Sequence, residues 1–259
     1  MINESKYYKR INDLHRQHFT GEVPFYSSAE LRPVEKILLS SFTKEAKLLD
    51  LACGSGRFSI GAAKMGFNVL GVDITPKTVE AAQTRARSLK LSNASFRIGD
   101  MSELDLKDSA FDYVVCPRFS INAISVFSRR LRAVKEMLRV VKPGGKVYIE
   151  SFNRWYIGRG LIIPAKLYII DLLRNAQILT KKVMSSEYEG LMPGDLIYPA
   201  NKVKGATEGY THLPSVIEIR RWIPRGSSYN FYSIPQMIRP QKFDLFKYFR
   251  YSIWLVIEK

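Results

Sequence analysis

A glycine-rich turn that follows a short apolar run is the first feature of the sequence with a chemical use. Residues 47–52 form the run, Gly54-Ser55-Gly56 follow it, and a helical pattern begins at Arg57. Small residues let a ligand lie against the backbone, and the first turn of a helix offers free N–H groups to a carboxylate or a phosphate. The segment therefore predicts a ligand-binding loop, although an ordinary tight turn would use the same glycines.

Acidic residues stand at the ends of the next two predicted strands. Asp73 closes residues 68–73, 23 positions after Asp50, and an acid there can accept hydrogen bonds from both hydroxyls of a ribose. Asp100 and Met101 follow residues 95–98, where a carboxylate and an apolar neighbour can hold an adenine. A helix cap or a loop acid explains each residue alone, but three strand-end signals together favour one shared site.

The expected elements place these residues along one edge of a sheet. Strands are predicted at residues 47–52, 68–73, 95–98, 111–116 and 146–151, and helices at 57–65, 75–90 and 128–141. This alternation predicts right-handed crossovers and a parallel sheet that is covered on both faces. Ligands bind at the carboxyl ends of such strands. Pro143-Gly144-Gly145 is interpreted as a turn before the fifth strand.

The alternation stops after the fifth strand and returns near the C-terminus. Residues 152–213 are interpreted as an insertion, with one amphipathic helix expected within 156–179 and little regular structure in 189–211. Ser215 to Glu218 match a capping box, which favours a helix over the alternative of a strand at 216–223. Strands are expected at 228–234 and 252–258. The chain then forms one domain, with a helical cap (1–45), a core (46–151), a lid (152–213) and the end of the sheet (214–259).

In combination, these segments resemble the class I S-adenosylmethionine-dependent methyltransferases, and among them the type 11/25 domains. Residues 48–60 (LLDLACGSGRFSI) look like motif I of that family, and 140–149 (VVKPGGKVYI) are similar to the segment before its fifth strand. Residues 71–74, 99–101 and 111–116 resemble the acidic, adenine and strand-four motifs. The likeness covers 47–151 well and 211–259 loosely. It implies a Rossmann-like α/β fold of seven mostly parallel strands, with helices on both faces, an antiparallel last strand and a lid after strand five.

The resemblance implies S-adenosylmethionine as the cofactor and assigns its methionine part to motif I. Asp50, Gly54 and Gly56 would face that part of the cofactor. Ala52 and Arg57 belong to the same expected set. Arg57 stands where many members of the family have a third glycine.

The nucleoside and the sulfonium are assigned, on the same resemblance, to the later strand ends. Asp73 would hold the ribose, with Ile74 against the adenine. Asp100 would bind the adenine amino group, and Met101 would pack on its ring. Cys116 and the residues after it would lie under the sulfonium.

Two further polar residues are candidates for catalysis. Asn122 lies six residues after the strand expected at 111–116, near where the family places groups that face the substrate, and His212 precedes the helix expected from Ser215. A base is needed only if the acceptor must lose a proton, and a structural role at the helix entry explains His212 as well. No metal site is expected, because Cys53 and Cys116 lack metal-ligand spacing.

The charge balance of the chain bears on its partners. The net charge of +16 favours phosphate-bearing, anionic or membrane-surface partners, although a basic enzyme with solvated charges has the same balance. Residues 118–142 carry seven basic residues against Glu136, which fits either a solvated helix face or a nucleic-acid surface. Residues 161–173 are apolar, and either pack as a lid helix or lie on a membrane or a lipid-like substrate.

The remaining composition favours a cytoplasmic protein. The two cysteines suit a reducing compartment, and the N-terminus lacks the apolar stretch of a secretory signal. No uncharged apolar run of about 18 residues occurs, so no transmembrane helix is expected.

Three functions follow as hypotheses. The leading one is an enzyme that methylates a small-molecule or lipid-like acceptor by in-line displacement. The second is a methyltransferase of tRNA or rRNA that uses the basic surface. The third is a non-catalytic protein that binds S-adenosylmethionine.

Overall fold

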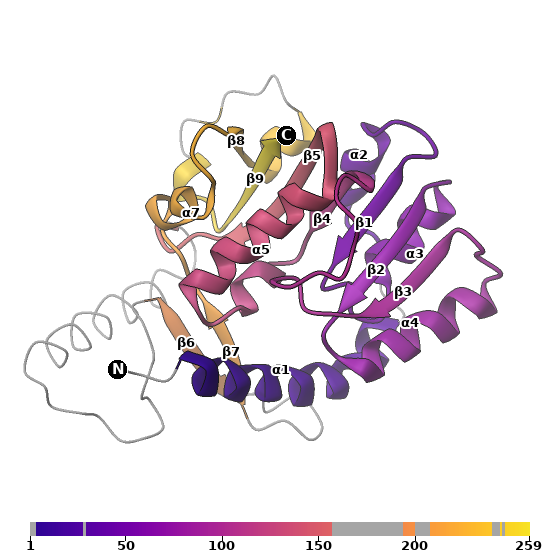
Figure 1. Ribbon diagram of the computed structural model, residues 1–259, viewed down its shortest axis with the longest axis horizontal. Helices are drawn as coiled ribbons and strands as arrows, with labels where there is room; N and C mark the ends of the chain where they lie inside the picture. The colour runs from indigo at the N-terminus through magenta and orange to yellow at the C-terminus, as the bar shows by residue number, and fades with distance from the viewer. Residues whose placement is uncertain (1–3, 28–29, 157–193, 200–207, 240–243, 245–246) are drawn as a thin grey trace, which may run out of the picture.

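A seven-stranded sheet forms the centre of the computed structural model, which describes residues 4–27, 30–156, 194–199, 208–239, 244 and 247–259 (Figure 1). The strand order is β3-β2-β1-β4-β5-β9-β8. The first five strands are parallel: β1 (Lys47–Leu51), β2 (Asn68–Asp73), β3 (Ala94–Ile98), β4 (Phe111–Cys116) and β5 (Val141–Phe152). Because β2 and β3 lie on one side of β1 and β4 lies on the other, a crevice is expected at the carboxyl ends of β1 and β4.

The last strand is antiparallel, as the resemblance implied. β9 (Ser252–Glu258) lies between β5 and β8 (Ser228–Ser233) and is antiparallel to both. The predicted architecture of seven mostly parallel strands with an antiparallel strand near one edge is therefore confirmed.

Helices cover both faces of the sheet because its strands are apolar on both sides. In β1, Leu49 packs in a cluster with α5 (Phe127–Val140) and α7 (Val216–Trp222), whereas Leu48 packs in a second cluster with α2 (Pro33–Ser40) and α3 (Arg57–Lys64). Neighbouring residues of a strand point to opposite faces. The sheet is therefore the middle layer of three.

Capping residues set where two of the helices begin. Pro76 is the first residue of α4 (Pro76–Ser88), as its position after Thr75 predicted. The hydroxyl of Ser215 accepts a hydrogen bond of 3.2 Å from the backbone N–H of Glu218, so residues 216–222 form a helix and not the alternative strand. The short helix α8 (Ile234–Ile238) and two 3₁₀ turns (Ser120–Ala123 and Lys247–Phe249) complete these elements.

The long helix α1 (Glu4–Ser27) lies across the carboxyl edge of the sheet (Figure 1). It contacts α4 at one end of this edge and β7 (Glu208–His212) at the other. It therefore covers the edge where the predicted site residues emerge.

The hairpin of β6 (Asp195–Pro199) and β7 corrects the expectation of little regular structure in 189–211. Its strands are antiparallel, and the hydroxyl of Tyr210 donates a hydrogen bond of 2.6 Å to Asp195. His212 also lies 2.7 Å from Asp195. These contacts join the two strands. The sequence of the two strands lacks the alternation of apolar residues that would have predicted them.

β5 begins at Val141 and includes residues 143–145, where a turn was expected before the strand. Gly144 there has a φ of +76°, and the pairing with β4 shifts from Phe111–Val141 to Tyr113–Lys146, so the segment is an irregularity within the strand. The N–H of Gly144 donates to the carbonyl oxygen of Lys259, and the N–H of Lys259 donates to that of Gly145. Lys259 therefore supplies backbone hydrogen-bond partners for this irregular segment.

The helix expected within 156–179 and the apolar stretch 161–173 lie almost wholly outside the described residues. Among the helices that the structure describes, none is both long enough and apolar enough to cross a membrane.

Candidate functional site

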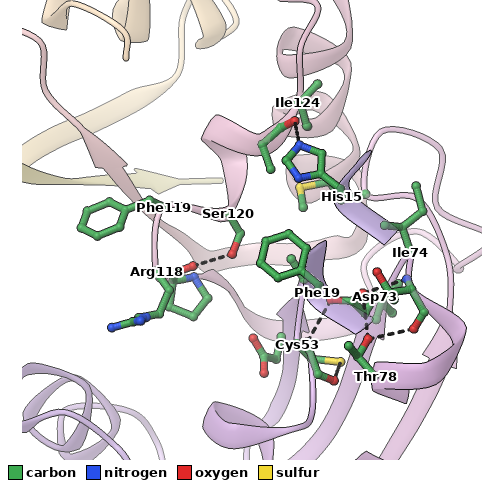
Figure 2. A pocket seen from close by; sticks show the side chains of 18 of the residues that line it. His15, Phe19, Cys53, Asp73, Ile74, Thr78, Arg118, Phe119, Ser120 and Ile124 are labelled. Atoms are coloured by element: carbon green, nitrogen blue, oxygen red, sulfur yellow. Dashed lines mark hydrogen bonds between the residues drawn. The ribbon is translucent and has the colours of Figure 1, made fainter. Parts of the chain in front are cut away.

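A cavity of about 590 Å³ lies between the carboxyl ends of the strands and helix α1 (Figure 2). Its floor comes from the segments after β1, β2 and β3. Its roof comes from α1 and β7, through the residues Asn12, His15, His18, Phe19, Tyr210 and Thr211. A third group, the wall, combines the residues after β4 with the last residue of β5 and the residue before β9: Pro117, Arg118, Phe119, Phe152 and Tyr251.

The glycine loop of the floor uses two glycines for different reasons. Both lie in the left-handed region, with φ of +53° at Gly54 and +77° at Gly56. A Cβ on Gly56 would approach Ala82 and Phe96 to 3.0–3.1 Å, so that glycine is required by packing. A Cβ on Gly54 would meet no atom within 4 Å, and Gly54 lines the cavity. This glycine therefore borders space that a ligand can fill.

Asp73 holds the floor together at the end of β2. Its carboxylate accepts hydrogen bonds from the N–H of Gly54 at 2.9 Å, the N–H of Thr75 at 2.8 Å and the hydroxyl of Thr78 at 3.2 Å. Burial raises the pKa of Asp73. The side chain lines the cavity while it joins the glycine loop to the start of α4.

Asp50 presents a buried oxygen that has no hydrogen-bond partner among the described residues. Its Oδ2 accepts a 2.6 Å hydrogen bond from the hydroxyl of Ser59, whereas Oδ1 receives none. Burial raises the pKa of Asp50 to about 7. A buried acceptor without a partner is costly, and Asp50 lines the cavity. A ligand that carries a cationic N–H group would satisfy it.

The third acid is also part of the floor. Asp100 Oδ1 accepts hydrogen bonds of 2.8 Å from both the N–H and the hydroxyl of Ser102, and Oδ2 lies 3.9 Å from Arg129. Ile74 and Met101 line the cavity beside it. The acidic and apolar residues predicted after β2 and β3 therefore share one cavity.

Three other predicted cofactor residues have different surroundings. Ala52 lines the cavity with a φ of 55°. Arg57 also lines it, but its guanidinium forms hydrogen bonds of 2.5 and 2.7 Å to the buried carboxylate of Glu35. Cys116 is fully buried in β4, and the lining begins at the next residue, Pro117.

The structure does not bring the two catalytic candidates into the cavity lining. Asn122 is buried, donates to the hydroxyl of Ser151 and accepts from the N–H of Phe152, both at 3.1 Å. His212 is buried with Nδ1 2.7 Å from Asp195 and Nε2 2.7 Å from Glu218. Both side chains join distant segments of the fold.

Helix α1 supplies the histidines that the sequence analysis missed. Nε2 of His15 lies 2.8 Å from the carbonyl oxygen of Ala123. The ring stacks on Phe19 and meets Tyr210 edge-on. Burial lowers the pKa of His15 to about 4; the bond to Ala123 opposes this effect, and the nearby His18 adds to it. The spacing i, i+3, i+4 of His15, His18 and Phe19 was the available signal, because such residues share one helix face.

An aromatic group forms the wall of the cavity. Phe119 stacks on Phe152 with centroids 3.9 Å apart, and Tyr251 meets both rings edge-on. Arg118 and Phe119 both have positive φ, near 60°, which costs about 1–3 kcal/mol per residue. The buried carboxylate of Glu150 accepts a 2.7 Å hydrogen bond from the N–H of Arg118 and stabilises this conformation.

Comparisons with known proteins agree on one family. Residues 42–194 match a family model described as a methyltransferase domain. The protein YqeM of Bacillus subtilis, a methyltransferase by name, is 34% identical over 122 residues, 47% of this chain and 49% of YqeM. The demethylmenaquinone methyltransferase of Bacillus cereus is 30% identical over 163 residues, 61% of this chain and 65% of that enzyme. The chain thus spans about half of one relative and just under two thirds of the other.

A solved structure shows the same fold. It is described as a S-adenosylmethionine-dependent methyltransferase of Methanosarcina mazei and aligns with a TM-score of 0.62 at 23% identity. The alignment covers 89% of this chain and 99% of that protein.

Proposed function

This chain belongs to the methyltransferase-domain family as an S-adenosylmethionine-dependent enzyme, and we propose that its acceptor is a small molecule bound between the wall and the roof of the cavity. The cofactor supplies, when bound, an electrophilic methyl group on a sulfonium. The protein then has to hold both reactants close together and exclude water.

The floor suits each part of the cofactor. The partnerless Oδ1 of Asp50 suits the ammonium group of the methionine part, and the open space beside Gly54 suits its backbone-like chain. The carboxylate of Asp73 still has acceptor capacity for ribose hydroxyls beyond its three internal hydrogen bonds. Ile74, Asp100 and Met101 are the candidates for the adenine end.

The aromatic wall of the cavity is the observation that carries the choice of a small acceptor. A cavity of about 590 Å³ is within the range of small-molecule sites. The rings of Phe119, Phe152 and Tyr251 offer an apolar surface to a planar or lipid-like acceptor. The relative named demethylmenaquinone methyltransferase is, by that name, an enzyme with a small-molecule acceptor, which supports this class.

The basic helix α5 offers less to RNA than its composition indicates. Arg130 is buried, with hydrogen bonds to the carbonyl oxygen of Ile124 at 2.6 Å and to Glu218 at 3.2 Å. It therefore belongs neither to a solvated helix face nor to a nucleic-acid surface, the two alternatives considered for the basic residues of 118–142. Arg129 lies near Asp100, and Arg139 pairs with Glu136 and Asp108. Arg132 and Lys135 remain exposed on this helix.

Acceptor profiling with labelled cofactor tests the proposal. Labelled S-adenosylmethionine is incubated with the protein and either an ultrafiltered cell extract or bulk tRNA and rRNA. We expect label in the small-molecule fraction, and label confined to RNA would contradict the proposal. An RNA acceptor that engages six or more phosphates would also lose about a thousandfold in affinity from 50 to 200 mM salt.

The double variant Arg132→Ser with Lys135→Ser tests whether the exposed charges of α5 contribute to turnover. These side chains are exposed on α5, outside the residues that line the cavity. Turnover of a small acceptor is therefore expected to stay within a few fold of the unmodified protein.

A further inference from the structure

His15 has its ring fixed in the cavity by one backbone hydrogen bond. Nε2 lies 2.8 Å from the carbonyl oxygen of Ala123, and because a carbonyl oxygen can only accept, Nε2 carries the hydrogen. The neutral ring then keeps a lone pair on Nδ1. In Figure 2 the hydrogen-bonded edge of the ring faces the backbone beside Ile124, and Phe19 stacks against a face of the ring. The fold therefore selects the tautomer whose Nδ1 accepts protons.

The surroundings of His15 keep the ring uncharged. Its side chain is 5% exposed, and the rings of Phe19 and Tyr210 pack against it. Burial lowers its pKa to about 4, so the ring is neutral at physiological pH. A neutral ring also avoids a second positive charge beside the sulfonium of the cofactor before reaction.

We propose that Nδ1 of His15 takes the proton of a hydroxyl acceptor as that oxygen receives the methyl group. The inference rests on the proposed function. The acceptor oxygen forms a bond to the methyl carbon while the carbon–sulfur bond breaks, and the sulfur keeps the electron pair. The hydroxyl proton moves to Nδ1, so the positive charge of the sulfonium ends on the imidazolium, which returns the proton to water.

The properties of this base fit oxygen better than nitrogen. A hydroxyl that is gaining a methyl group becomes a strongly acidic oxonium, so even a weak base accepts its proton. A methylated amine keeps its proton as a stable ammonium and needs no such base. His15 therefore points to an O-methyltransferase.

The tautomer is tested without any acceptor. The chain contains three histidines, so protein labelled with ¹⁵N-histidine gives a simple NMR spectrum in which the signals lost in His15→Gln belong to His15. We expect a neutral ring with hydrogen on Nε2 and a bare Nδ1 at neutral pH, with S-adenosylhomocysteine added. A hydrogen on Nδ1 would overturn the proposal.

The role in proton transfer is tested by two reactions that differ in whether a proton moves. Methyl transfer to the small-molecule extract requires loss of a hydroxyl proton. The second reaction forms S-adenosylmethionine from methyl iodide and S-adenosylhomocysteine, releases iodide and moves no proton. We expect His15→Gln to slow the first reaction by about 10²–10⁴-fold and to leave the second, and calorimetric cofactor affinity, within a few fold. Arg16→Gln, on an exposed position of the same helix, is the matched control.

The outcomes separate this inference from the function on which it rests. If the unmodified protein labels no small molecule, both fall. If the unmodified protein labels a small molecule and His15→Gln labels it equally well, only the role of His15 is refuted. The same holds if His15→Gln slows the reaction with methyl iodide as much as it slows methyl transfer to the acceptor. The labelled product should release its methyl group as methyl iodide in hot hydriodic acid, as O-methyl groups do, and a product that retains the label would overturn the choice of oxygen.

Discussion

The floor and the roof of the cavity differ in how the chain builds them. The floor comes from residues 50–101, where three successive strands each have an acidic residue at or near their carboxyl end. The roof joins residues 12–19 to residues 210–211, which are almost two hundred positions apart. The floor carries carboxylates and matches a family pattern, whereas the roof carries histidines and aromatic rings. The difference fits our proposal that the floor binds the cofactor and that the roof and wall bind the acceptor.

The largest expected effect tests whether the floor depends on the ion pair that joins α2 to the start of α3. Glu35 is fully buried and accepts two hydrogen bonds from Arg57 at the start of α3. Glu35→Ala leaves the buried guanidinium of Arg57 without its carboxylate partner, so we expect the free energy of unfolding in urea to fall by about 3–5 kcal/mol. Lys36→Ala is the control, because the exposed pair of Lys36 and Glu30 should contribute less than about 1 kcal/mol. Equal losses in the two variants would show that the floor does not depend on this ion pair.

The next effect separates ligand space from backbone strain in the floor. Gly54→Val places a side chain in the open space of the cavity, so we expect the affinity for S-adenosylmethionine to fall more than about 100-fold, or roughly 3 kcal/mol. Gly66→Val also places a β-branched residue at a positive φ, since Gly66 has a φ of +95° and open space around it, but Gly66 lies outside the lining. Calorimetry should find its cofactor affinity unchanged. Similar losses in both variants would mean that strain, and not occupied space, explains the result.

The third prediction compares Asp50 of the floor with His15 of the roof, because burial shifts their pKa values in opposite directions. Burial raises the pKa of Asp50 to about 7, so from about pH 4 to pH 7 the folded state binds more protons than the unfolded state, and stability falls as pH rises. Burial lowers the pKa of His15 to about 4, so from pH 4 to about 6.5 the unfolded state binds more protons, and stability rises with pH.

Urea unfolding at a series of pH values should therefore separate the two residues. Asp50→Asn removes the falling contribution, so its stability should rise with pH between 4 and 6.5 more steeply than that of the unmodified protein. His15→Gln removes the rising contribution, so the stability of this variant should rise less steeply with pH than that of the unmodified protein. Each variant's slope should differ from that of the unmodified protein by up to about 1.4 kcal/mol per pH unit, because each substitution removes the linkage of one proton. Parallel pH profiles for the two variants would refute both charge assignments.

The smallest effect concerns the ribose contact assigned to Asp73. Asp73→Ala should weaken binding of S-adenosylmethionine by about 1–3 kcal/mol through loss of charge-assisted hydrogen bonds. Asp112→Ala is the control, because Asp112 binds Lys47 and Lys142 and is not among the lining residues. An unchanged affinity in Asp73→Ala would contradict the assignment of Asp73 to the ribose.

The sequence by itself determined most of the sheet and the composition of the floor. β2, β4 and β9 have the bounds that the sequence predicted. β1, β3 and β8 differ from prediction by one residue at one end, and β5 differs most because it begins five residues earlier. Asp50, Asp73 and Asp100 share one cavity because parallel strands joined by short crossovers end at the same edge. Local patterns of apolar residues, glycines and caps were sufficient for these features.

Only the tertiary structure decided what covers that edge. The sequence predicted a helical cap but not that His15 enters the cavity, since the face of a helix that packs inward depends on its partner. His212 and Asn122 have polar side chains at plausible distances along the chain, yet Asp195, Glu218 and Ser151 bind them elsewhere. Glu35 was not foreseen as the partner of Arg57. The physical reason is that backbone patterns act within a few residues, whereas a side chain's partners are set by segments that meet only after the chain has folded.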